Sequence, residues 1–171
     1  MGIRGFEPSF LVGINAVQAA HGSRLAALAG RRLSGFAVVR FAGDGEWFAD
    51  CPVVLDFDGV QVEVCHWKLD ELSIGWDMID TAAAIAGWEW AGFTPVWSDA
   101  DERLRPFEGR KLREAALLEW LPSGRDLAAG TVAVEFAFGS AGCFRIANGL
   151  DENRIETGTA QPDYVRYRLS R

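Results

Sequence analysis

Cysteine and histidine are scarce in this chain, which has three cysteines and two histidines among 171 residues. Cys51, Cys65 and Cys143 are odd in number and show no C-x-x-C spacing, so the sequence predicts neither a disulfide framework nor a zinc site. Free cysteines are typical of a reducing compartment, and we expect a cytoplasmic protein. With only His21 and His66 available, general acid-base chemistry would depend on carboxylates, and the sequence singles out none of them.

Long apolar runs and the common catalytic motifs are also missing. No stretch reaches the ~18 apolar residues of a membrane span. The apolar segment 10–17 resembles a signal peptide only faintly, because Gly13, Asn15 and Gln18 interrupt it and no cleavage site follows. The chain has no G-x-S-x-G, phosphate loop, H-E-x-x-H or dinucleotide fingerprint. These absences weigh against an enzyme and favour a protein that acts by binding.

Positive charge is in the minority, since 17 lysines and arginines face 24 aspartates and glutamates, for a formal charge of -7. Such a chain lacks the attraction for phosphates on which nucleic-acid binding depends, and it is equally unsuited to an anionic membrane. An acidic surface suits solubility or a cationic protein partner. The excess of arginine over lysine, with abundant alanine and glycine, indicates a GC-rich bacterial genome.

What the chain does contain is an internal sequence repeat, which we call the echo. The segment Arg24–Leu33 returns as Arg103–Leu112, a shift of 79 positions, with five of ten residues identical. The segment Leu69–Ile74 returns as Leu150–Ile155 with a shift of 81. Unrelated segments would match at roughly one position in fifteen to twenty. The echo therefore predicts two copies of one block, related by an approximate two-fold axis.

The two copies are expected to share one hydrophobic interior. A chain of 171 residues that is 49% hydrophobic can bury one sizeable core, and no low-complexity linker divides it. We therefore predict a single domain over residues 1–171, built of repeats at about 10–80 and 89–160.

Apolar residues alternate within each block, as they do in strands with one buried face. Val53, Leu55 and Phe57 show this pattern, and segment 132–136 repeats it. The pair Asp58–Gly59 is a strong signal of a two-residue hairpin loop. The sequence therefore predicts a mainly β fold. Its core would be two pseudo-two-fold-related, antiparallel three-stranded meanders that form a sandwich or a barrel, with one or two short helices.

Helix signals are weaker. Ser23 could cap a helical turn over 23–30, and the alanine run in 76–87 suits a short helix. Near-alternation of apolar residues in 164–169 predicts a final edge strand, which could pair within the chain or with a neighbour.

Charged residues recur with the echo. Arg31 with Asp70, and Arg110 with Asp151, predict an ion pair inside each block, because a guanidinium can bind a carboxylate through two hydrogen bonds. The same residues could instead form an anion site. We favour the structural brace, because a ligand site is seldom duplicated in full.

A carboxylate cluster is the next candidate. Asp70 and Glu71, with Asp151, Glu152 and the following Asn153, would meet near the two-fold axis, as a hard cation requires. The spacing of a calcium loop is absent, however. We therefore predict a binding role for these residues and no metal or cofactor.

Aromatic residues supply another candidate surface. Among seven tryptophans, Trp88 and Trp90 lie in the connector between the blocks, outside the strand pattern, where they could form a binding surface or fill the core. Cys65 and His66 are adjacent, but alternation on a strand places them on opposite faces. A catalytic thiol and base pair is therefore disfavoured, and His66 is expected in the core.

Three functional hypotheses remain. The first is a non-catalytic interaction protein, such as an immunity or antitoxin-like inhibitor of a cationic protein partner, as a monomer or homodimer. The second is a small-molecule or metal-binding protein, even an enzyme, with a site between the two repeats. The third is a structural or oligomerising module. A convex acidic surface would favour the first, and a concave pocket with converging polar groups would favour the second.

Overall fold

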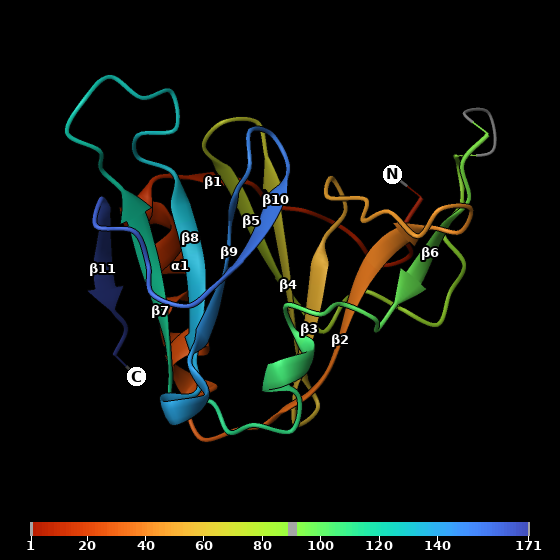
Figure 1. The fold of residues 1–171 in the computed structure, drawn as a ribbon, viewed down its shortest axis with the longest axis horizontal. Coiled ribbons are helices and arrows are strands. Elements are labelled where there is room, and N and C mark those ends of the chain that lie inside the picture. The colour runs from red at the N-terminus through yellow and green to blue at the C-terminus, as the bar shows by residue number, and fades with distance from the viewer. Residues whose placement is uncertain (1, 89–91, 171) are drawn as a thin grey trace.

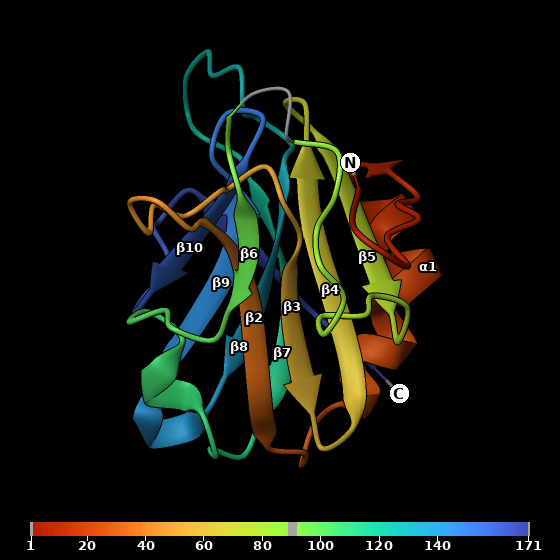
Figure 2. The same ribbon diagram turned by 90° about the vertical axis from the view of Figure 1, so that its right-hand side faces the viewer.

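Two antiparallel β-sheets packed face to face make up the protein, in a computed structural model that describes residues 2–88 and 92–170 (Figures 1 and 2). The main hydrophobic core lies between the sheets. The predicted mainly β class is confirmed, and the arrangement is a sandwich because the sheets stay open rather than closing into a barrel.

The strands divide into a six-stranded and a five-stranded sheet. The six-stranded sheet has the order β1-β5-β4-β3-β2-β6 and contains β1 (Leu11–Val12), β2 (Leu33–Phe41), β3 (Val53–Phe57), β4 (Val60–Trp67), β5 (Glu71–Trp76) and β6 (Pro95–Ser98). The five-stranded sheet has the order β10-β9-β8-β7-β11 and contains β7 (Glu114–Trp120), β8 (Val132–Ala137), β9 (Cys143–Asn148), β10 (Asn153–Thr157) and β11 (Tyr164–Arg168). The helices are α1 (Ile14–Ala27) and the 3-10 turns η2 (Arg105–Phe107) and η3 (Gly139–Ala141).

Each sheet is built around a meander of consecutive strands. Strands β2 to β4 and β7 to β9 are the predicted three-stranded meanders, and each continues into a fourth strand, β5 or β10. The fourth strands begin within the repeated segments Leu69–Ile74 and Leu150–Ile155. Both segments start with the residues Leu-Asp-Glu, and we call the turns that they form the LDE turns. The predicted tail strand is also present, because β11 pairs with β7 of the same chain.

The hairpin between β3 and β4 follows the sequence signal. Phe57 pairs with Val60, which leaves Asp58 and Gly59 as a two-residue loop. Both loop residues have positive φ, 50° and 82°, as the tight hairpin turn requires. Aspartate tolerates this conformation and glycine adopts it without a steric penalty.

The echoed segments meet directly. Residues 30–33 and 109–112 pair antiparallel through four backbone hydrogen bonds: Gly30 N to Leu112 O (2.8 Å), Gly109 N to Leu33 O (2.7 Å), Leu33 N to Arg110 O (3.0 Å) and Leu112 N to Arg31 O (2.7 Å). Exchanging every residue for the one 79 positions away turns each bond into another of the four. The pairing therefore has a local two-fold symmetry, and it links the starts of β2 and β7.

The symmetry does not extend unchanged along the strands. Phe36 pairs with Leu55 in the first meander, so a uniform shift of 79 would pair Ala115 with Val134. Ala115 instead pairs with Phe136, two residues further on. A register irregularity near the start of β2 accompanies this difference.

Apolar side chains from both sheets fill the space between them. Phe57 and Phe136 stack with ring centroids 5.4 Å apart, and both are fully buried. Burying such a side chain stabilises the fold by about 1.5–3 kcal/mol. Helix α1 closes one side of the sandwich, where it contacts β7 and β1 and buries Leu25.

Helix α1 is longer than the sequence signal suggested. It begins after Gly13, whose φ is 79°, and Ser23 lies inside it on the exposed face, so the prediction of Ser23 as the cap is wrong. The buried residues Ile14, Val17 and Leu25 form a stripe on one face. Packing of that stripe, rather than a side-chain cap, explains the helix.

The helix predicted within 76–87 is absent. Trp76 belongs to β5, and the alanines form a turn whose Ala86 N donates to Gly2 O (3.0 Å). A Cβ on Gly2 would lie 1.9 Å from Ala86 O, so only glycine allows this approach. Backbone pairing with the N-terminal segment has overridden the alanine propensity.

The outer faces of the two sheets are covered differently. The N-terminal segment and the connector between β5 and β6 lay an apolar cover on the six-stranded sheet. The buried residues of this outer cluster are Ile3, Val39, Phe48, Cys51, Val54 and Ile79. Across the described ranges, no helix has the length and apolar character needed to cross a membrane.

The five-stranded sheet carries charged groups beneath its cover. Arg145, whose side chain is 2% exposed, forms ion pairs with Glu135 (3.6 Å) and Glu156 (3.0 Å) and donates to Gly158 O. Arg166 also pairs with Glu135 (3.1 Å). The Arg145 guanidinium and the Glu135 carboxylate are therefore both buried against the five-stranded sheet.

Candidate functional site

An open pocket of 780 Å³ lies at the β2–β6 edge of the six-stranded sheet. We call it the arginine pocket, because three of its seven lining residues are arginines. The seven lining residues are Arg40, Trp47, Ala100, Asp101, Glu102, Arg103 and Arg105. These residues come from the end of β2, from the reversal that follows it, and from the segment that runs from the end of β6 into the first residue of η2.

The end of β2 positions the first wall of the arginine pocket. The chain reverses after Phe41, with Gly45 at a φ of 75°, and returns so that Trp47 pairs with Arg40 in an antiparallel bridge. Directly opposite residues in such a bridge point to the same face, so the indole and the guanidinium are neighbours. Arg40 Nη1 donates to Gly45 O (2.7 Å), which fixes the guanidinium against the turn.

The segment after β6 forms the other wall. Asp101 accepts a hydrogen bond from Arg103 N (3.0 Å), and Leu104 N donates back to Asp101 O (3.2 Å). This local turn is typical of aspartate, whose side chain bonds to the backbone two residues further on. Leu104 is fully buried in the main core and anchors the turn.

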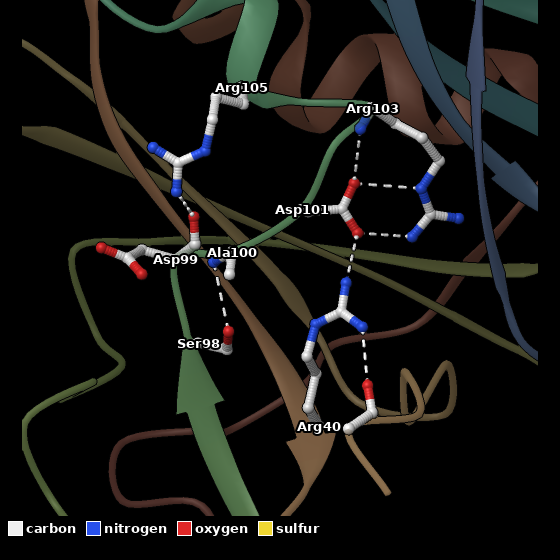
Figure 3. A network of polar contacts seen from close by, with 8 residues as sticks. Arg40, Ser98, Asp99, Ala100, Asp101, Arg103 and Arg105 are labelled. Atoms are coloured by element: carbon white, nitrogen blue, oxygen red, sulfur yellow. Dashed lines mark hydrogen bonds and ion pairs between the residues drawn. The ribbon is translucent and has the colours of Figure 1, made fainter.

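Asp101 lies at the centre of the polar network, as Figure 3 shows. Its carboxylate accepts from Arg103 Nε (3.0 Å) and Nη2 (2.6 Å), and from Arg40 Nη2 (3.2 Å). Burial by itself would raise the pKa of Asp101, but the hydrogen bonds and charge of Arg103, with the charge of Arg40, outweigh it and hold the pKa below its usual value. Asp101 is therefore ionised at neutral pH and holds both arginines in place.

Two donors in the arginine pocket are left without an acceptor. Within the described part of the chain, Arg40 Nε and Trp47 Nε1 are buried and have no hydrogen-bond partner. The Arg103 guanidinium lies over the Trp47 ring, 4.3 Å from its centroid. An unsatisfied buried donor costs about 1–3 kcal/mol, so each is an unusual feature of a folded chain.

The lining of the arginine pocket is positive although the chain is acidic. The lining residues include three arginines and two acidic residues, Asp101 and Glu102, which is a formal excess of one positive charge. Arg105 is the most exposed of the three arginines, and it donates to Asp99 O (3.0 Å) and pairs with Glu108 (3.7 Å). The arrangement can bind an anionic or hydrogen-bond-accepting group.

No protein-family model, curated protein or solved structure matches this chain.

The structure separates the predicted ion pairs. Arg31 donates to Asp58 O (3.3 Å) at one end of β4, whereas Asp70 follows the other end. The eight residues of β4 span more than 20 Å at roughly 3.3 Å per residue, further than the two side chains reach. The prediction of an Arg31–Asp70 pair is therefore wrong.

The second predicted pair fails for the same reason. Arg110 is exposed and lies in the backbone pairing near the start of β7, while Asp151 occupies the turn between β9 and β10 at the opposite end of the strands. Each repeated arginine stands near the local two-fold axis, and each repeated aspartate stands far from it. The brace predicted between Arg110 and Asp151 does not form.

The LDE turns do come together. Asn148 Nδ2 donates to Lys68 O (2.8 Å), so the β4–β5 and β9–β10 turns lie side by side (Figure 1). Asp70, Asp151 and Glu152 are exposed there. Glu71 is half-buried and pairs with Lys68 (4.0 Å). Among residues 2–88 and 92–170, no group of three or more His, Cys, Asp or Glu side chains is placed to hold a metal.

Asn153 and His66 join the two sheets. Asn153 Oδ1 accepts from His66 N (2.9 Å) and lies 3.1 Å from His66 Nδ1, while its Nδ2 donates to Ala49 O and Cys51 O. His66 Nε2 lies 2.9 Å from Val132 O. Both residues are 1% exposed, so Asn153 has a structural place rather than a surface one. Burial lowers the pKa of His66, against the opposing effect of these contacts.

Of the two tryptophans predicted to form a binding surface, the structure describes Trp88. Trp88 is half-buried and packs edge-on against Phe48, with centroids 4.8 Å apart, in the outer cover of the six-stranded sheet. Trp90 lies outside the described residues. The chain on either side of residues 89–91 stands at the edge of the molecule, away from the LDE turns (Figure 1). A binding surface formed by Trp88 and Trp90 stays a prediction.

The sequence does not predict the arginine pocket. Arg103 belongs to the echo, and the sequence gives Arg40, Trp47 and Asp101 no pattern that joins them. The spacing of Asp101 and Arg103 was the one local signal, because an aspartate two residues before an arginine can bind both its backbone and its side chain.

Proposed function

We propose that the protein acts by binding rather than by catalysis, and that the arginine pocket is its ligand site. The observation that carries this proposal is a concave pocket with two unpartnered donors, Arg40 Nε and Trp47 Nε1, in which the buried Asp101 carboxylate holds the Arg40 guanidinium. Ligand sites typically combine a concave shape with a few convergent polar groups. This supports the second sequence hypothesis, because the lining takes Arg40 and Trp47 from the first repeat and the segment 100–105 from the second.

The nucleophiles and bases of the chain support binding over catalysis. Burial raises the pKa of the Cys65 thiol to about 12 and also raises that of Cys51, so neither becomes a thiolate near neutral pH. His66 is buried with both ring nitrogens in contact with oxygens, and His21 Nδ1 accepts from Trp76 Nε1 (3.2 Å). The free state of all three cysteines supports a reducing compartment.

A small-molecule screen followed by NMR tests the pocket. The indole N–H of Trp47 is assigned as the signal that disappears in W47F, and each hit is mapped by the indole signals that it shifts. We expect hits to move the Trp47 signal and leave that of Trp67, an exposed residue outside the pocket, unchanged. Hits that move other signals and never Trp47 would contradict the proposal.

The adjacent LDE turns support a second candidate function, inhibition of a cationic partner. Asp70, Asp151 and Glu152 project from one end of an acidic chain, where opposite charge would speed association. The test compares proteins captured from a bacterial lysate by the wild type and by the D70N/D151N/E152Q variant. A basic partner captured by the wild type alone supports inhibition, and equal capture by both contradicts it.

A further inference from the structure

The unpartnered donors indicate which chemical group the arginine pocket takes. Arg40 and Trp47 are direct partners across the bridge that ends β2, so their side chains lie on one face of the sheet. Arg40 Nε and Trp47 Nε1 are both donors, and neither side chain has an acceptor to offer a ligand. The matching group therefore supplies two acceptor atoms.

The other two nitrogens of Arg40 each have a protein acceptor. Its Nη1 donates to Gly45 O (2.7 Å) and its Nη2 to Asp101 (3.2 Å), so among the described residues Nε is the one nitrogen of this guanidinium without an acceptor. Rotation of the guanidinium would break both contacts. The orientation that keeps them offers a ligand one unpartnered nitrogen from Arg40 and one from Trp47.

The charge of the arginine pocket narrows the choice of ligand. The lining residues carry a formal excess of one positive charge, with three arginines against Asp101 and Glu102, and Arg105 is also paired with Glu108 outside the lining (3.7 Å). A carboxylate carries one negative charge at pH 7, whereas a phosphate monoester carries about 1.5 to 2. We propose, on the basis of the binding function above, that the arginine pocket binds a carboxylate, with one oxygen accepting from Arg40 Nε and the other from Trp47 Nε1.

Arg103 lies beside this pair of residues. Its guanidinium lies over the Trp47 ring, and its side chain is 35% exposed, with contacts to Asp101 on one edge. Asp101 also binds Arg40 (3.2 Å), so one carboxylate orients both guanidinium groups. The charge of Arg103 adds to the attraction for an anionic ligand.

Titrations followed by the Trp47 indole signal test this inference. The probes are acetate, inorganic phosphate, choline and glucose at constant ionic strength, together with a short peptide bearing either a free or an amidated C-terminus. We expect acetate and the free-acid peptide to shift the Trp47 signal and the amidated peptide to bind at least tenfold more weakly. A shift by acetate alone would assign the site to small organic acids, and a shift by both would extend it to peptide ends.

Two variants remove one donor each. R40K keeps the charge beside Asp101 but has no Nε donor, and W47F keeps an aromatic ring under Arg103. We expect each to weaken acetate binding about tenfold, the loss of one hydrogen bond to a charged group. Binding to W47F is followed by the backbone signals of residues 100–103. The control is R125K, which changes an exposed loop arginine outside the pocket.

The outcomes separate the inference from the function on which it rests. A Trp47 shift with choline or glucose and none with acetate would overturn the carboxylate assignment while leaving the pocket as a ligand site. Phosphate binding more tightly than acetate would overturn it in the same way. Unchanged acetate affinity in both R40K and W47F would place the anion elsewhere and overturn it. If no probe or screening hit moves the Trp47 signal, the proposed function fails as well.

Discussion

The two sheets of this protein solve the same problem, covering an outer face, by different means. The six-stranded sheet is covered by apolar side chains such as Phe48 and Ile79, which need only to be removed from water. On the five-stranded sheet, charged side chains are buried or half-buried instead, namely Arg145, Glu135 and Glu156. These side chains need partners of opposite charge in addition to removal from water. An apolar cover tolerates change in proportion to volume, whereas a buried ionic layer depends on the presence of every member.

The largest expected effect is at Arg145. R145M leaves the buried Glu135 and the half-buried Glu156 without their central cation, and we expect the free energy of unfolding to fall by about 3–5 kcal/mol in urea titrations. The triple variant E135L/R145M/E156L removes the three buried or half-buried charges together and should recover most of that loss, because Arg166 keeps its pair with Glu114 (3.3 Å) and Arg154 is half-exposed.

A surface arginine of the same network serves as the control. Arg154 pairs with Glu156 (2.6 Å) but is half-exposed, so R154A should cost less than about 1 kcal/mol. Equal losses in R145M and R154A would mean that burial does not distinguish the two ion pairs.

The apolar cover is tested at Ile79, which is 5% exposed. I79A should lower the free energy of unfolding by about 2–4 kcal/mol, and I79V by about 1 kcal/mol, because the loss follows the volume removed. A loss in I79V as large as in I79A would show that shape, rather than buried volume, governs this face.

The contact that His66 makes between the two sheets is tested by measuring stability as a function of pH. His66 is buried and its pKa is lowered, so below the unfolded-state pKa of about 6.5 the unfolded chain binds a proton that the folded chain refuses. The free energy of unfolding should therefore fall as pH drops from 7 to 5, by at most about 1.4 kcal/mol per pH unit.

His21 complicates this reading, because burial and Arg24 lower its pKa too. Urea titrations at pH 7, 6 and 5 should thus compare H21Q with H21Q/H66Q. The second variant should lack most of the slope that the first retains. Equal slopes in the two variants would remove His66 as the pH-dependent group.

The smallest effect is expected at the edge of the six-stranded sheet. W47F deletes a buried donor without an acceptor, and this gain offsets the lost ring area, so the free energy of unfolding should change by less than about 1 kcal/mol. Urea titration checks it. A loss above about 2 kcal/mol would indicate that Trp47 Nε1 is satisfied in solution.

The sequence was a good guide wherever the signal was local. The alternation at Val53, Leu55 and Phe57 and the Asp58–Gly59 pair lead directly to β3, its hairpin and β4. The tail strand followed from alternation alone. These succeed because side-chain direction in a strand and positive φ in a two-residue turn are properties of a few neighbouring residues.

The sequence was a poor guide wherever partners came from far along the chain. Alanine propensity predicted a helix near Ala86, but Gly2 supplied a backbone partner. Arg31 and Asp70 were paired by recurrence, although a full strand separates them. The arginine pocket joins Arg40 to Asp101, 61 positions apart, and no local pattern marks that contact.

By itself, the sequence determined the β class, the main hairpin and the echo whose two copies pair at Gly30–Leu33 and Gly109–Leu112. Only the tertiary structure decided the strand register of the second half, the contrasting covers and the pocket of Arg40, Trp47 and Asp101. The physical reason is that strand periodicity and turn conformation act over a few residues. Burial and charge pairing, in contrast, depend on which distant side chains the fold brings together.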